Sequence, residues 1–246
     1  MLQSFRAQYK PTGARDMLLS RTTTSPVSKT CLMRSELVMM LQLQEAMNSA
    51  VNPQWREQGN AWYRAIWVEC AELLDHYGWK WWKAQQPDLA QVELELIDIW
   101  HFGLSALLES GADDRLIAED LEHALREPVA ATLDFRRAIE DFALTTLSTK
   151  TFDLQGFAQL MSLAGLSFET LFRSYVGKNV LNIFRQHHGY RLGSYLKLWG
   201  GKEDNEHLVD IMSAMSSSEL SQERIYRSLE ERYQAFVQKT LVASSE

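Results

Sequence analysis

Apolar residues recur along most of the chain at intervals of three and four, the spacing that places them on one face of an α-helix. The clearest stripe covers residues 34–51 and ends at Asn52-Pro53, a pair that terminates helices. Neither a strand-like alternation nor an internal repeat breaks this spacing. The pattern therefore predicts an all-α fold, with helices over residues 34–51, 60–77, 89–110, 112–126, 130–147, 152–173 and about 219–240.

Two segments depart from this pattern. Residues 175–199 mix charged, polar and glycine residues with apolar ones, which predicts the least core-like part of the chain. Residues 1–32 hold five Lys or Arg against one acidic residue and are rich in Ser and Thr. This composition predicts a disordered extension before Met33, with an organelle transit peptide as the alternative.

Composition narrows the class of protein. The 246 residues carry a net charge of −7, which argues against broad binding to nucleic acid because that binding depends on neutralising phosphates. No apolar run approaches the ~20 residues needed to span a bilayer. Cys31 and Cys70 lack metal-binding spacing, which favours a reducing compartment. We therefore expect a cytoplasmic protein that contacts neither membrane nor nucleic acid, or an organellar one if residues 1–32 are a transit peptide.

Two pairs of acidic residues carry the candidate chemistry. Glu69-Cys-Ala-Glu72 and Glu95-Leu-Ile-Asp98 each place two carboxylates on one face of a predicted helix, because residues three apart are neighbours there. Four carboxylates on facing helices repel one another unless a cation neutralises them, and hard divalent cations prefer oxygen ligands. The pairs predict a Mg²⁺ site, and Mg²⁺ held in this way usually shares its ligand shell with substrate phosphates.

Further polar and aromatic blocks stand around these pairs in a fixed order. They are Leu41-Gln42-Leu43-Gln44-Glu45-Ala46-Met47-Asn48, Trp79-Lys-Trp-Trp-Lys83, Asp98-Ile-Trp-His101-Phe102, Tyr175-Val-Gly-Lys178-Asn179-Val-Leu-Asn182-Ile-Phe-Arg185-Gln186, Gly189-Tyr190, Lys197 and Trp199-Gly-Gly-Lys-Glu-Asp-Asn205. From about Leu41 to Asn205 the chain resembles the dimeric, all-α dUTPase family, relatives of the MazG-type nucleoside triphosphate pyrophosphohydrolases. The resemblance implies a helical bundle of the all-α NTP pyrophosphatase type with a mobile helical lobe.

The resemblance also implies roles for individual residues at the metal and the phosphates. Mg²⁺ would be held by the catalytic acids Glu69, Glu72, Glu95 and Asp98, with Glu69 as the base that orients the attacking water. Three phosphate-binding residues stand at i, i+4 and i+7 on one helix face, and an Arg among them can grip two phosphate oxygens at once. The full implied phosphate set is Lys178, Asn182, Arg185, Tyr190, Lys197 and Asn205.

The nucleoside would be recognised from other helices. Gln44 and Asn48 lie one turn apart, and their carboxamides offer the donor and acceptor that the edge of uracil requires. Trp81 would supply a flat face for stacking on the base. His101 and Phe102, which follow Asp98 closely, would complete the pocket.

The implied activity is Mg²⁺-dependent hydrolysis of dUTP, and of dUDP, to dUMP by a homodimer. Such an enzyme limits uracil in DNA and supplies dUMP for thymidylate synthesis. Residues 33–246 would form one domain, with a rigid metal-binding core at about 34–126, a phosphate-binding lobe at about 152–205 and a C-terminal helix at 219–240. Attack would fall on the β-phosphorus by analogy, although the sequence does not choose between the α- and β-phosphorus.

Three alternatives stay open from the sequence. Because a flipped carboxamide matches cytosine as well as uracil, the enzyme could act on dCTP, or on both dCTP and dUTP. A helical dimer that binds nucleotides without turnover would keep the same fold. Asp98-Ile-Trp-His101 resembles half of a di-iron carboxylate site, but the matching position after Glu72 is Asp75 rather than a histidine.

Overall fold

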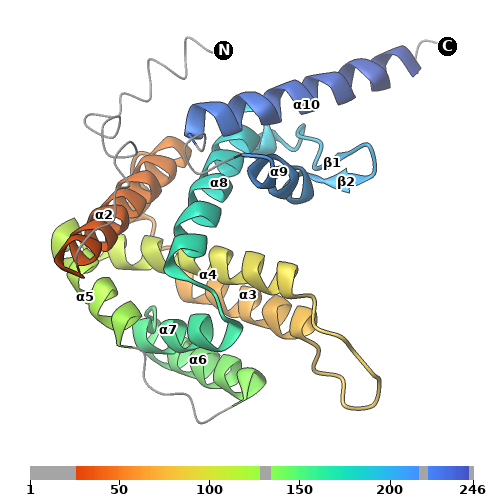
Figure 1. Cartoon of the computed structure of the whole chain (residues 1–246). Helices are drawn as coiled ribbons and strands as arrows, with labels where there is room; N and C mark the ends of the chain where they lie inside the picture. The colour runs from red at the N-terminus through yellow and green to blue at the C-terminus, as the bar shows by residue number, and fades with distance from the viewer. Residues whose placement is uncertain (1–25, 128–133, 216–220, 244–246) are drawn as a thin grey trace.

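The computed structural model describes residues 26–127, 134–215 and 221–243, and within these ranges the fold is almost entirely helical (Figure 1). The strands in these ranges are β1 (Leu198–Trp199) and β2 (Lys202–Glu203), which form one short antiparallel hairpin. The prediction of an all-α fold is confirmed. Residues 1–25 of the predicted N-terminal extension lie outside the described residues. Residues 26–32 are helical, so the prediction of disorder up to residue 32 is wrong for this part.

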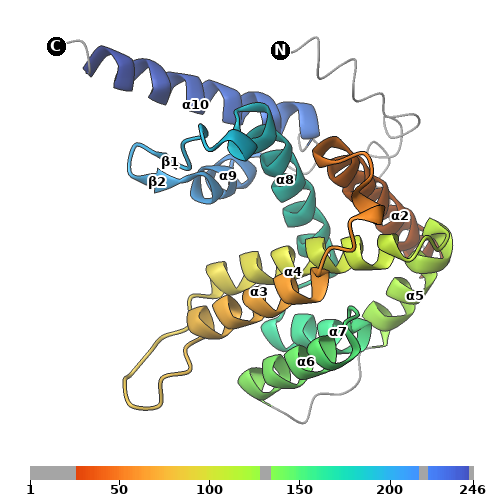
Figure 2. The same ribbon diagram turned by 180° about the vertical axis from the view of Figure 1, so that it is seen from behind.

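The helices before residue 165 pack around a first hydrophobic core. α4 lies at its centre, with Leu96, Trp100 and Leu104 fully buried, and the Trp100 ring stacks on Phe157 at a centroid distance of 5.1 Å. α3 runs beside α4, and an extended loop joins their far ends (Figures 1 and 2). The helices are α2 (Pro26–Val51), α3 (Trp62–Tyr77), α4 (Leu89–Glu109), α5 (Asp114–Arg126), α6 (Phe135–Thr149) and α7 (Leu154–Ala164), with a 3₁₀ turn, η1 (Trp55–Glu57), between α2 and α3.

Short polar side chains mark where several helices begin. At the start of α4, the carboxylate of Asp88 accepts a hydrogen bond of 3.2 Å from the backbone N–H of Gln91. Such a cap gives a partner to an N–H group that has none inside the helix. The helix starts predicted at residues 60, 89 and 112 hold within two residues. Equivalent caps are Asp113, Asp134, Asp153 and Ser167.

The prediction of one helix over residues 152–173 is wrong, because the helix ends at Gly165 and a second one follows. Gly165 has φ 70°, a left-handed conformation that ends α7, and Ser167 then caps the next helix, α8 (Phe168–His187). α8 continues through most of the segment predicted to be least core-like, and Tyr175 and Phe184 on it are fully buried. That prediction is also wrong, because the polar residues of α8 face a cavity and other polar groups inside the protein.

The second half of α8 belongs to a separate, aromatic core. It packs against α9 (Asp204–Ser213) and α10 (Gln222–Ala243), together with the hairpin and a 3₁₀ turn, η2 (Tyr190–Leu192). Phe184 lies at the centre of this core, among Tyr195, Trp199, Tyr226 and Tyr233. α8 is therefore the element shared by both cores (Figure 1).

The structure adjusts the C-terminal prediction. α10 matches the helix predicted at about 219–240, although residues 216–220 lie outside the described residues, and α9 was not predicted. Within the described ranges, no helix combines the length and the apolar character needed to cross a membrane.

Gly103 on α4 provides a test of the first core. A Cβ atom at this position would lie 2.7 Å from the ring of Phe152, closer than side chains pack. We expect Gly103→Ala to lower the free energy of unfolding by about 1–3 kcal/mol, although alanine favours helices, because the added methyl group overfills the core. Urea denaturation measures the effect, and adding Phe152→Leu should reduce the cost of the methyl group. A Gly103→Ala protein as stable as the original would show that Phe152 moves aside freely.

Candidate active site

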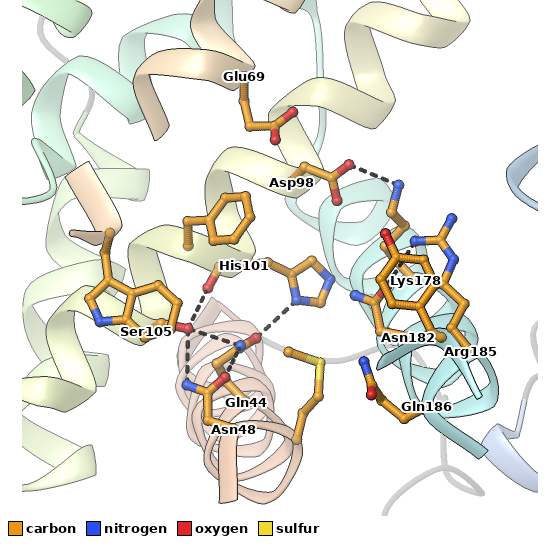
Figure 3. A pocket seen from close by; sticks show the side chains of 14 residues that line it. Gln44, Asn48, Glu69, Asp98, His101, Ser105, Lys178, Asn182, Arg185 and Gln186 are labelled. Carbon is orange, nitrogen blue, oxygen red and sulfur yellow. Dashed lines mark hydrogen bonds and ion pairs between the residues drawn. The ribbon is translucent and has the colours of Figure 1, made fainter. Parts of the chain in front are cut away.

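A cavity of about 320 Å³ opens between α2, α3, α4 and α8, with η2 at its edge (Figure 3). Acidic, basic, amide and aromatic side chains all reach it, a mixture typical of a site that binds a charged organic molecule. Each wall comes from a different part of the chain, so that residues more than 100 positions apart meet here. The lining residues are Gln44, Met47, Asn48, Trp62, Glu69, Asp98, His101, Phe102, Ser105, Lys178, Asn182, Arg185, Gln186 and Tyr190.

Three of the four predicted metal ligands converge. Oxygen atoms of Glu69, Glu95 and Asp98 lie within 4.8 Å of one another. Glu69 comes from α3, whereas Glu95 and Asp98 are one turn apart on α4, and the packing of α3 beside α4 brings them together. Glu72, one turn after Glu69, is exposed and lies outside this trio, although its charge still acts on Glu69 and Glu95.

The trio is electrostatically strained without a cation. Burial raises the pKa of Glu69 to about 8, with further contributions from the charge of Asp98 and a hydrogen bond with Glu95. Burial and Asp98 also raise the pKa of Glu95, but the same hydrogen bond lowers it, so the shared proton resides on Glu69. A divalent cation would remove this repulsion, and a set of carboxylate oxygens suits Mg²⁺. The residues present therefore fit the metal that the sequence predicted.

α8 supplies cations to the opposite wall of the cavity. The Nζ atom of Lys178 lies 2.8 Å from Oδ2 of Asp98, and Lys178 is only 3% exposed. Asn182 and Arg185 follow on the same face of the helix and also line the cavity, as their spacing predicted (Figure 3). Tyr190 lies at the edge and is 50% exposed.

Arg185 does not offer its guanidinium as a free two-pronged clamp. Its Nε and Nη2 atoms each donate to the Asp204 carboxylate at 2.8 Å, and Nη1 donates to Asn182 at 3.1 Å. The hydroxyl of Tyr195 also donates to Asp204, at 2.9 Å. Although burial alone would raise the pKa of Asp204, its hydrogen bonds and ion pair with Arg185 lower it. The two N–H groups that were expected to bind two phosphate oxygens therefore bind the Asp204 carboxylate, a partner that the sequence did not predict.

The floor of the cavity is a buried network of amide, hydroxyl and imidazole groups. Gln44 donates to Asn48 at 3.1 Å and to Ser105 at 3.0 Å, and its oxygen lies 2.9 Å from Nδ1 of His101. The hydroxyl of Tyr175 lies 3.1 Å from the same Gln44 oxygen. Burial lowers the pKa of His101 to about 3, with the charge of Lys178 as a second cause, so its ring is neutral at physiological pH.

The network corrects the assumption that Gln44 is free to meet a base. Both the NH₂ group and the oxygen of its side-chain amide already have hydrogen-bond partners inside the protein. Ser105 and Tyr175 were missed as partners, although Ser105 lies one turn after His101 on the same helix face, a signal that was available. His101 points to Gln44 and takes no part in the carboxylate trio, which argues against a di-iron site.

Three predicted substrate-binding residues do not line the cavity. Trp81 is 89% exposed on the extended loop after α3, where its ring packs edge-on against Trp82 at 5.3 Å. Lys197 lies 3.5 Å from Glu203 in the hairpin region, and Asn205 accepts a bond of 3.4 Å from Arg185. Trp62 and the predicted Phe102, with ring centroids 6.4 Å apart, line the cavity instead, together with Tyr190 at its edge. Trp62 was not predicted as a site residue, although it stands two turns before Glu69 on α3.

Comparison with known proteins identifies the family. A family model described as dUTPase matches residues 36–190, which is more than half of the chain. The chain belongs to the all-α dUTPase family. No curated protein matches it closely. As a member of this dUTPase family, the chain is a hydrolase that acts on dUTP, and the matched range contains both acidic pairs and all of α8.

The strain in the carboxylate trio predicts how stability depends on pH without metal. The pKa of Glu69 rises from 4.5 in the unfolded chain to about 8 in the folded one, so the folded state holds a proton that the unfolded state has lost. This contribution is fully present below pH 4.5 and is lost as the pH rises through 8. In EDTA, the melting temperature should therefore fall between those pH values, and Glu69→Gln should flatten the fall. Glu57→Gln, which alters an exposed carboxylate, should leave the slope unchanged.

The buried pair of Arg185 and Asp204 predicts a large loss of stability. Asp204 is fully buried, so Asp204→Asn leaves the Arg185 charge without a full counter-charge. We expect a loss of about 3–5 kcal/mol in urea denaturation, as for one partner removed from a buried ion pair. The matched control is Asp210→Asn, which removes an exposed carboxylate 2.9 Å from Lys202 and should change stability little. Equal effects of the two substitutions would contradict this role of Asp204.

Proposed function

We propose that the protein hydrolyses dUTP, and also dUDP, to dUMP in a reaction that requires Mg²⁺. The observation that carries the proposal is the convergence of Glu69, Glu95 and Asp98 beside a cavity that Glu69, Asp98 and Lys178 line. These carboxylates would hold Mg²⁺, which would offset the charge of the substrate phosphates. Glu72, exposed one turn beyond Glu69, would add a ligand from the solvent side.

Glu69 is the best candidate for the base. It lines the cavity, whereas Glu95 is buried behind it, so a water beside the phosphates can reach the Glu69 carboxylate. A carboxylate in that position can accept a proton from the attacking water. Asp98 then serves mainly to hold the cation.

The two ends of the cavity suggest how a nucleotide lies in it. Gln44, Asn48 and His101 form one end, and Lys178, Asn182 and Arg185 form the other, with Asp98 beside Lys178 (Figure 3). Phe102 and Tyr190 also line the cavity. We place the nucleoside among the amides and aromatic rings and the phosphates along α8. With its other N–H groups engaged by Asp204, Asn182 and Asn205, Arg185 would reach the phosphates through its one remaining N–H group. Lys197 and Asn205 would join this set only if the hairpin and α9 shift toward the cavity.

Cytosine remains a second candidate base. The choice of uracil rested on Gln44 and Asn48 together, but the amide of Gln44 is engaged inside the protein. Asn48 alone can present either a donor or an acceptor, so it favours neither base. dCTP is therefore the competing substrate to include in every assay.

We also propose that the protein acts as a homodimer. Large apolar side chains are exposed on α3 (Trp67 and Val68) and on the loop that follows it (Trp79, Trp81 and Trp82). The three tryptophans of the loop contact one another through Trp82, and exposed apolar patches of this kind mark protein contacts. A second copy of the chain would cover this patch and bury Trp81.

Hydrolysis assays on a nucleotide panel test the proposal. We expect turnover of dUTP and dUDP with Mg²⁺, little with dTTP or UTP, and none in EDTA. Glu69→Gln should lower kcat roughly 10²–10⁴-fold, the usual contribution of a positioned base, while Glu57→Gln should not. Turnover that persists in EDTA would refute the metal assignment, and a preference for dCTP would replace the substrate but keep the mechanism.

A further inference from the structure

Lys178 and Asp98 form an ion pair that the proposed reaction does not explain. The Nζ–Oδ2 distance is 2.8 Å, and the side chains are 4% and 24% exposed, so the pair lies inside the cavity wall rather than on the surface (Figure 3). Asp98 is at the same time a member of the carboxylate trio. The oxygen atoms that would hold a divalent cation are therefore partly occupied by an ammonium group of the protein itself.

The pair and a bound cation oppose each other for two reasons. The ammonium group and a metal ion would draw on the lone pairs of one carboxylate. A positive charge 2.8 Å from Asp98 would also lie within a few ångströms of a doubly charged ion, where like charges repel strongly in a partly buried site. Lys178 in this position thus satisfies the trio without metal and hinders metal binding.

The surroundings of Lys178 offer its ammonium group a second place. Asn182 and Arg185 stand one and two turns further along the same face of α8, and both line the cavity. A lysine carries a compact charge on a flexible four-carbon chain, so it can exchange partners without movement of the helix. The side of the cavity toward Asn182 is where the proposed phosphates would lie.

We propose that Lys178 is an internal counter-ion that pairs with Asp98 before metal and nucleotide bind and transfers to a substrate phosphate when they do. This inference rests on the proposed function. Metal alone binds weakly, because it must displace Lys178 with no phosphate to receive it. Metal and nucleotide then bind cooperatively, and the charged trio seldom holds a cation unless substrate is present.

Calorimetric titration of Mn²⁺ into the full, nucleotide-free chain tests this. Lys178→Met keeps the length of the side chain and removes its charge. We expect Mn²⁺ to bind this variant at least about tenfold more tightly than the original chain, a gain of roughly 1.4 kcal/mol. With α,β-imido-dUTP present, the original chain should instead bind Mn²⁺ more tightly than Lys178→Met does, because the variant lacks the cation that would pair with a phosphate.

Two further variants isolate the cause. Lys178→Arg keeps the charge and should bind Mn²⁺ as weakly as the original chain does. Lys202→Met changes the net charge by the same amount but lies in an exposed pair with Asp210, and should have no effect. Unchanged or weaker Mn²⁺ binding by Lys178→Met, in the absence of nucleotide, would overturn the inference.

The outcome separates this inference from the proposed function. If the original chain neither binds Mn²⁺ nor hydrolyses dUTP, the proposed function fails. If it does both and Mn²⁺ binding is insensitive to Lys178, only the inference fails. Should Lys178→Met not fold, the ¹⁵Nζ NMR signal of Lys178 in the original chain, assigned with Lys178→Arg, decides: a shift on adding Mg²⁺ with the imido nucleotide supports the transfer, and an unchanged signal overturns it.

Discussion

Repulsion among Glu69, Glu95 and Asp98 is the constraint around which the cavity is organised. Oxygen atoms of these carboxylates are held within 4.8 Å of one another by the packing of α3 beside α4, and Glu95 is buried. A raised pKa at Glu69 and the ammonium group of Lys178 beside Asp98 both reduce the repulsion. The proton and the ammonium group are the two positive charges that we propose a divalent cation and a polyphosphate displace.

α8 carries this electrostatic arrangement because it belongs to both hydrophobic cores. Its first half is anchored in the helices around α4, and its second half in the aromatic core with α9 and α10. The pair of Arg185 and Asp204 joins the cavity to the start of α9, so that the second core fixes a cation of the site. The family match ends at Tyr190, before α9 begins, yet the partner of Arg185 lies beyond that point.

The buried amide network serves a different purpose from the ionic side of the cavity. Gln44, Asn48, Ser105 and His101 bond mainly to one another, and burial keeps His101 neutral. Hydrogen bonds linked in this way make the network rigid, because each partner fixes the orientation of the next. The end of the cavity where we place the nucleoside is thus preformed, while the end proposed for the phosphates is held by ion pairs.

The sequence by itself determined the all-α class, most helix boundaries, the family and the neighbouring positions of Glu95 and Asp98. These follow from helical spacing, capping residues and motif order, which are properties of short stretches of chain. It did not reveal that α8 runs unbroken through residues 168–187, since polar residues facing a cavity look like a solvated surface. The sequence predicted that Trp81 stacks on the nucleobase and that Arg185 binds phosphate. In the folded protein Trp81 is exposed, and Arg185 is paired with Asp204. Only the tertiary structure decided these partners, because the groups that a polar side chain meets depend on which distant elements pack against it.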